Sequence, residues 1–180
     1  VMDITALCTQ GTDEGNYTKL KNYNAFGQIV PAYLTLGSPW VFAYGSGLGM
    51  MNYAKFGDGG SCGGIEFAYK PDALKFKYKH PGTTGETAHA IVYLWKGKFI
   101  SNVPSACDKN GTITNYTQLD DVDRVVLGKQ TDGVSTKGEL IASLDYKITE
   151  TTTGWQEVTL PLNYQSNSTP EKLNIIFSAG

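Results

Sequence analysis

The chain has 180 residues, of which 41% are hydrophobic and 18% charged, a composition typical of one folded domain rather than a disordered chain. Its 15 basic and 17 acidic residues give a net charge of -2, which gives no support to nucleic-acid binding. No apolar run approaches the roughly 18 residues of a membrane-spanning helix, and the 21 glycines and 7 prolines favour many turns over long helices.

The first 35 residues are weakly patterned. Residues 2–9 are compatible with a strand, and residues 11–24 are typical of a loop. We therefore expect residues 1–35 to be an N-terminal extension, or a first strand and linker, and residues 36–180 to form the main domain. The opening residues lack the basic end, apolar stretch and cleavage site of a signal peptide.

The next segment combines apolar residues with two glycine-rich stretches. Residues 40–44 predict a strand, and alternate apolar residues in 65–69 predict another. The glycine run at 45–49 lacks the strand-to-helix setting of a dinucleotide fingerprint and is expected to be a loop or bulge. Residues 58–64 are expected to form a tight loop because four of them are glycine.

The clearest signal in the chain is the period-two alternation of residues 73–80. Three apolar side chains fall on one face and three lysines on the other: Leu74, Phe76 and Tyr78 against Lys75, Lys77 and Lys79. Successive side chains of a strand point to opposite faces, so this pattern predicts a strand with one buried face.

Residues 88–95 are apolar on both faces and predict a central strand. Turn-forming residues at 81–85 separate them from the strand at 73–80, and we expect the two strands to form a hairpin with a longer loop. His80 and His89 flank that loop, but two histidines are too few ligands for zinc.

Three further strands are predicted, by alternation over residues 140–148, 158–164 and 173–177. Pro161 falls inside the second and has no N–H to donate, which places that strand at a sheet edge or at a bulge. Residues 119–127 are compatible with one or two helical turns.

Many short strands without long intervening helices predict an all-β sandwich or barrel. Two antiparallel sheets that each bury one face suit the half-polar strands best.

Several segments resemble the PCMD family, whose domains are associated with carbohydrate metabolism. In chain order they are LGSPW at 36–40, DGG at 58–60 with GG at 63–64, KPDALKFKYK at 70–79, YLWKG at 93–97, VLG at 126–128, Trp155, LPLNY at 160–164 and PEKLNIIFSAG at 170–180. The resemblance covers about residues 36–180. It implies a jelly-roll β-sandwich similar to carbohydrate-binding modules, but no set of catalytic residues.

The resemblance also implies an exported protein of a gut-dwelling Gram-negative bacterium, in the periplasm or on the outer cell surface, often lipid-anchored, beside glycan-degrading systems. Family members usually continue beyond the segment that ends here at Gly180, to a final Leu-x-Val-Asp-Asp strand. That strand is expected either beyond this sequence or from elsewhere. A sheet without it has an unpaired edge, which suits a neighbouring domain or an edge-strand partner.

Three aromatic residues are candidates for stacking on a sugar: Trp40, Tyr44 and Trp155. Trp40 and Tyr44 lie beside the glycine run, where a loop-borne ring would make a platform for the C–H face of a pyranose. Trp155 follows a Thr-Thr-Thr-Gly run, and both a rim position and core packing remain open for it. Trp95 is expected in the core because it ends a doubly apolar strand.

Asp58 is the candidate metal ligand. Its carboxylate could join backbone carbonyls around a structural calcium ion, or it could cap its own turn. The three carboxylates of Asp120, Asp121 and Asp123 lack the spacing of a calcium loop and are expected in a solvated turn.

The function expected from these features is that of a non-catalytic, exported glycan-binding module. A structural or adhesive spacer without ligand is the alternative. A glycoside hydrolase is less favoured, because it needs two facing carboxylates and the sequence places no pair among its candidates: Glu66, Glu86, Glu139 and Glu157.

Overall fold

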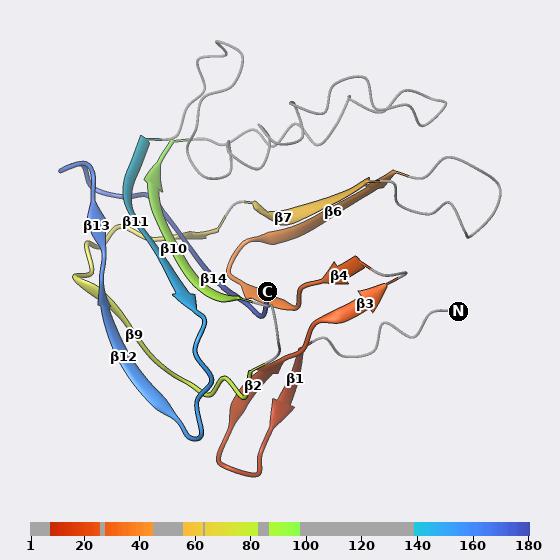
Figure 1. Cartoon of the computed structure of the whole chain (residues 1–180). Coiled ribbons are helices and arrows are strands. Elements are labelled where there is room, and N and C mark those ends of the chain that lie inside the picture. The colour runs from red at the N-terminus through yellow and green to blue at the C-terminus, as the bar shows by residue number, and fades with distance from the viewer. Residues whose placement is uncertain (1–7, 26–27, 45–55, 63, 83–86, 98–138) are drawn as a thin grey trace.

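The computed structural model describes residues 8–25, 28–44, 56–62, 64–82, 87–97 and 139–180, with the backbone alone at 24–25, 28–30, 38–44 and 56–62 (Figure 1). Every regular element in these residues is a β-strand, and every paired ladder is antiparallel. For these residues the prediction of an all-β fold with antiparallel sheets is confirmed. Within the same residues, no helix has the length and apolar character needed to cross a membrane.

The largest sheet has six strands in the order β13-β11-β10-β14-β5, with β8 also paired to β14. Its strands are β5 (Tyr33–Thr35), β8 (Ile65–Glu66), β10 (Ala88–Lys96), β11 (Glu139–Ile148), β13 (Asn163–Tyr164) and β14 (Lys172–Ser178). The doubly apolar β10 lies in the middle of this sheet, between β11 and β14, as its sequence predicts. A bulge shifts its register between Leu94 and Trp95.

A second layer consists of β9 (Ala73–Tyr78) and β12 (Gln156–Pro161) (Figure 1). Lys75 and Lys77 of β9 are exposed while Phe76 between them is half-buried, which confirms the predicted alternation. The Phe76 ring meets the Phe177 ring of β14 edge-on, with 5.1 Å between centroids. This contact joins the inner faces of the two layers, an arrangement consistent with a β-sandwich.

The core lies between these layers. Its buried members are Val92, Leu94, Ile141, Ala142, Leu162 and Leu173, and the half-buried side chains packed on them are Phe67, Leu74, Leu144 and Ile175. Trp95 is also buried, as expected from its sequence position.

Three smaller two-stranded ribbons complete the described structure: β1 (Cys8–Gly11) with β2 (Tyr17–Leu20), β3 (Tyr23–Ala25) with β4 (Gln28–Val30), and β6 (Ser38–Tyr44) with β7 (Phe56–Cys62). Residues 11–24 are therefore not a loop: they contain a hairpin turn, β2 and the start of β3. Strands of three or four residues are too short to show a period against polar neighbours, which is why the pattern was weak there.

The predicted hairpin between residues 73–80 and 88–95 is wrong. β9 pairs with β12, whereas β10 pairs with β11 and β14 in the other layer. The burial of the two strands explains the separation. β10 is apolar on both faces and suits a central position with two neighbours, while the lysine face of β9 requires a sheet with one side in water.

Pro161 ends β12, opposite Ala73. The next N–H, that of Leu162, donates to the carbonyl of Asp72 at 3.0 Å. Hydrogen-bonded and non-hydrogen-bonded pairs alternate along an antiparallel ladder. Since the Leu162–Asp72 pair is hydrogen-bonded, the Pro161–Ala73 pair is a non-hydrogen-bonded one, and the missing proline N–H costs no hydrogen bond between these strands. The buried Leu162 then carries the chain across to β13 in the large sheet. The single strand predicted at 158–164 is therefore divided between the two layers, while among the described residues β12 lies at a sheet edge, as Pro161 predicts.

Candidate functional site

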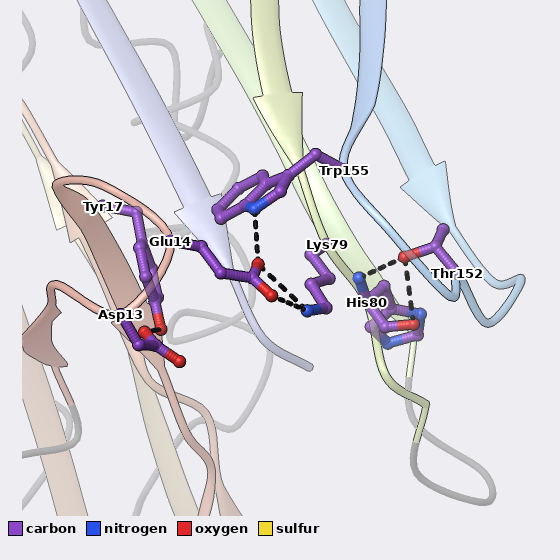
Figure 2. A network of polar contacts seen from close by, with 7 residues as sticks. All are labelled: Asp13, Glu14, Tyr17, Lys79, His80, Thr152 and Trp155. Atoms are coloured by element: carbon purple, nitrogen blue, oxygen red, sulfur yellow. Dashed lines mark hydrogen bonds and ion pairs between the residues drawn. The ribbon is translucent and has the colours of Figure 1, made fainter.

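The site forms where the turn of the β1–β2 hairpin meets the end of β9 and the residues that lead into β12 (Figure 2). Asp13 and Glu14 occupy the turn, and Gly15 completes it with a φ of 100°, a left-handed conformation that favours glycine. The turn therefore presents two adjacent carboxylates toward a different part of the chain.

Glu14 is the centre of the cluster. Its carboxylate accepts hydrogen bonds from the Lys79 ammonium at 2.8 and 3.0 Å and from the Trp155 indole N–H at 2.7 Å (Figure 2). The bond to Lys79 and then the bond to Trp155 lower the pKa of Glu14 below its usual value. Glu14 is thus held ionised, and it ties the hairpin to both β9 and the start of β12.

Tyr17 and Asp13 form the second half of the cluster. The Tyr17 hydroxyl donates to the Asp13 carboxylate at 2.5 Å, which lowers the pKa of Asp13 and raises that of Tyr17. The Tyr17 ring meets the Trp155 ring edge-to-face, with 5.2 Å between centroids and 70° between planes. This geometry is favourable for two aromatic rings and fixes the orientation of both.

The segment before Trp155 is pinned to the end of β9. The His80 N–H donates to the Thr152 hydroxyl at 2.8 Å, and the Thr152 N–H donates to the His80 carbonyl at 2.7 Å. The His80 ring contacts the Glu150 carbonyl through Nδ1 at 3.0 Å. Because both sides of this junction are bonded, the position of Trp155 relative to Lys79 is set by backbone contacts.

The cluster exposes an aromatic ring beside charged groups. The Trp155 side chain remains 38% exposed beside a second aromatic ring. Exposed carboxylates and an ammonium group border the rings, and these can bond to hydroxyl groups. Trp155 therefore occupies the surface position that its sequence left open, rather than the core.

Sequence reasoning missed Asp13, Glu14 and Tyr17, because they fall in the segment expected to be a loop. The one local signal was the Asp-Glu-Gly-Asn run, which is typical of a hairpin turn when strands flank it. Nothing in the local sequence connects this turn with Trp155, which is 141 residues away.

The structure places Trp40 and Tyr44 inside β6, not in a loop. Trp40 lies opposite Gly60 of β7, and Tyr44, the last residue of the strand, lies opposite Phe56. The strand predicted at residues 40–44 is confirmed, and the loop position expected for Trp40 is wrong, because Pro39 lies within the strand. Sugar contact by these two rings stays a prediction.

Asp58 also lies in a strand, opposite Phe42 in the β6–β7 ladder, so the expected tight loop at 58–64 is wrong over 58–62. Glycines have no side chains to show an alternation, yet their backbones pair like any others, which hid β7 from sequence patterning. Calcium binding by Asp58 stays a prediction. Among the described residues, no group of three or more His, Cys, Asp or Glu side chains could hold a metal ion.

The described candidates for a hydrolytic pair each have a different partner. Glu66 binds Lys172, Glu157 binds Lys75 at 2.8 Å, and Glu139 accepts hydrogen bonds from Ser166 and Ser168. The remaining sequence candidates lie outside the described residues: Glu86, Asp120, Asp121 and Asp123 with the expected turns at 119–127, and the glycine run at 45–49.

The two histidines contact different parts of the structure. His89 contacts the Asp145 carboxylate at 2.8 Å on the large sheet, whereas His80 contacts the loop before Trp155.

Comparison with known proteins yields no relatives. No protein-family model matches the chain, and no curated protein or solved structure matches it.

Proposed function

We propose that this protein is a non-catalytic, carbohydrate-binding β-sandwich module whose contact surface includes Trp155. The single observation that carries the proposal is the half-exposed Trp155 ring, held in position by Tyr17 and Glu14 and bordered by charged groups. Sugars are bound by flat aromatic surfaces that accept their C–H faces, with polar groups close enough to bond to their hydroxyls.

Further parts of the proposal rest on the sequence resemblance. We propose on this basis that the strands follow a jelly-roll order and that the chain is a member of the PCMD family. The resemblance also leads us to propose export to the periplasm or cell surface, with or without a lipid anchor. Trp40 and Tyr44 are proposed as a second aromatic contact, and Asp58 as a ligand of a structural calcium ion. The antiparallel two-layer architecture supports the jelly roll as one arrangement of such sheets.

A glycan array tests the proposal directly. The labelled chain is applied to an array of bacterial, plant and host glycans, and its best ligand is then titrated in solution. Trp155→Ala should weaken binding roughly tenfold or more, the loss expected when one stacking ring and its contact area are removed. Trp155→Phe should retain most of the affinity, because it keeps an aromatic face while losing the indole N–H.

Tyr69→Ala is the matched control, since Tyr69 is also an exposed aromatic residue but lies outside the cluster. It should leave glycan affinity unchanged. Absence of binding to every glycan, or equal affinities of the wild type and Trp155→Ala, would contradict the proposal.

A spacer module is the second candidate, and the bonding of the cluster favours it. The Trp155 N–H, the Glu14 carboxylate and the Lys79 ammonium bind one another, so the cluster also serves as a clasp between the hairpin and the sandwich. If the clasp is its whole role, Trp155→Phe and Trp155→Ala should both loosen the hairpin, and no glycan should bind.

A further inference from the structure

The smaller layer has an outer face that points away from the core. Leu74 packs on the core, and the Phe76 ring meets the Phe177 ring of β14, so these side chains of β9 face inward. Successive side chains of a strand point to opposite faces. Lys75 and Lys77 therefore face outward, and their side chains are 62% and 65% exposed. The outer face of β9 thus presents a row of lysines to solvent.

Trp155 lies at one end of the same outer face. The register pairs Gln156 of β12 with Tyr78 of β9, so one step further along the chain Trp155 comes beside Lys79. Both side chains bind the carboxylate of Glu14, which requires them to lie on the same side of the layer (Figure 2). The exposed indole ring and the row of lysines therefore belong to one surface.

Positive charge exceeds negative charge along this surface. Three lysines, Lys75, Lys77 and Lys79, share it with two carboxylates. Glu14 pairs with Lys79 at 2.8 Å, while Glu157 pairs with Lys75 at 2.8 Å and lies 3.7 Å from Lys77. Lys77 has the longest of these contacts, so it is the lysine best able to bind an additional anion. Alternate residues of a strand are about 7 Å apart, which places Lys77 close to the Trp155 end.

We propose that this outer face binds an acidic glycan, a chain of uronic-acid units, with one sugar ring on Trp155 and the carboxylates of neighbouring rings at Lys77 and Lys75. This inference rests on the proposed function, because Trp155 is the same aromatic contact. The exposed Thr159, opposite Lys75, adds a hydroxyl group that can bond to sugar hydroxyls. One carboxylate per ring suits a small surplus of positive charge, whereas the two carboxylates already on the face oppose a densely sulfated chain.

The test compares acidic oligosaccharides with their methyl esters. Oligosaccharides of galacturonic, glucuronic and mannuronic acid are titrated into the whole chain, each beside its fully esterified form. Esterification removes the negative charges and keeps the sugar rings. The best acid should bind roughly fivefold or more tightly than its ester, the difference expected for two exposed charge contacts. Added salt should reduce this difference.

Protein variants separate the lysines from the ring. The double variant Lys75→Gln with Lys77→Gln should weaken binding of the acid roughly fivefold and leave the ester unchanged. Lys147→Gln is the matched control, since Lys147 is an exposed lysine of β11 in the other layer, and it should change neither affinity. Trp155→Ala should weaken binding of both acid and ester, because both present the same rings.

Glu157→Gln tests the charge argument with an effect of the opposite sign. It removes a carboxylate that competes for Lys75 and Lys77, so it should strengthen binding of the acid roughly twofold and leave the ester unchanged. Weaker binding of the acid to this variant would contradict the assignment of the two lysines.

Two competitors distinguish a glycan from other anionic partners. Polyglutamate carries carboxylates without sugar rings, and phosphatidylserine vesicles present an anionic lipid surface. Neither should displace the acidic oligosaccharide, because neither supplies a ring for Trp155 to stack on. Displacement by either at an equal concentration of charge would overturn the proposal in favour of a general cationic surface.

The remaining outcomes tell this inference apart from the proposed function. Equal affinities for acid and ester, both dependent on Trp155, would overturn the acidic ligand and leave glycan binding in place. The same holds if no acidic oligosaccharide binds while the array detects neutral glycans. An array without any bound glycan would overturn both. The comparison of acid with ester leaves the protein unchanged, so its outcome holds whether or not a variant folds.

Discussion

The indole N–H of Trp155 donates to the carboxylate of Glu14 at 2.7 Å, across 141 positions of sequence. Glu14 also binds Lys79, so one side chain of the hairpin turn contacts the residue after β9 and the residue before β12 at once. The hairpin of β1 and β2 is otherwise a two-stranded ribbon, and such ribbons are marginally stable alone. The clasp at Glu14 is therefore expected to control how often the hairpin opens.

The first prediction concerns that opening. Glu14→Ala removes the acceptor for both Lys79 and Trp155, and hydrogen exchange of the β2 amides, Tyr17–Leu20, should accelerate severalfold. Exchange in β10 should not change, because the core does not depend on the hairpin. Glu150→Ala is the control: it removes a carboxylate from the neighbouring loop and leaves the backbone carbonyl that His80 contacts. Equal acceleration in both variants would contradict a specific clasp.

The second prediction concerns pH. The pKa of Glu14 is lower in the folded protein than in the unfolded chain, because Lys79 and Trp155 bind its ionised form. Its contribution is therefore fully present above the unfolded value, about 4.3, and is lost as the pH falls through the lower folded pKa. Asp13 acts in the same direction through its bond to Tyr17.

Hydrogen exchange of β2, corrected for the intrinsic pH dependence of exchange, measures this effect. In the wild type the hairpin should lose protection on acidification below about pH 4, and in Glu14→Gln the loss should be smaller. An identical pH profile in the two proteins would show that Glu14 does not carry the dependence.

The sequence predicted individual strands better than their partners. The lysine and apolar alternation of β9 and the two apolar faces of β10 follow directly from whether each face meets water. Neither pattern says which strand lies alongside, because pairing is a contact between distant segments. The short, turn-rich segment at 81–85 predicts a hairpin of β9 with the next strand along the chain, whereas the structure pairs β9 with β12, over 70 residues further on.

The candidate site also depends on contacts between distant segments, which the sequence does not reveal. Trp155 could be identified as an aromatic residue at a strand start, but its exposure depends on a turn near the N-terminus that packs against it. Asp13, Glu14 and Tyr17 are individually unremarkable polar and aromatic residues. Their chemistry arises only when the hairpin brings them to Lys79 and Trp155.

The third prediction tests the core. The Leu94 side chain is fully buried and lies in β10, a central strand of the large sheet. Leu94→Ala should lower the free energy of unfolding by about 2–5 kcal/mol, through lost apolar burial and the cavity left behind. Leu34→Ala is the matched control, since that leucine is half-exposed at the sheet edge, and it should cost less than about 1 kcal/mol. Urea unfolding measures both, and similar values for the two would contradict the two-layer core.

The last prediction concerns Gly82, which follows β9 at the junction with the Trp155 segment. Its φ is 84°, and an added Cβ would lie 2.2 Å from the Thr151 hydroxyl oxygen. Gly82→Ala should therefore destabilise the fold by about 1–3 kcal/mol, because both the backbone conformation and the contact oppose a side chain. Gly154→Ala provides the control on the other side of the same junction, since its Cβ would meet no atom within 4 Å. It should be neutral or slightly stabilising, because alanine reduces the freedom of the unfolded chain. If thermal unfolding gave the two variants equal stability, the close packing of residue 82 on Thr151 would be wrong, and with it the fixed position of Trp155.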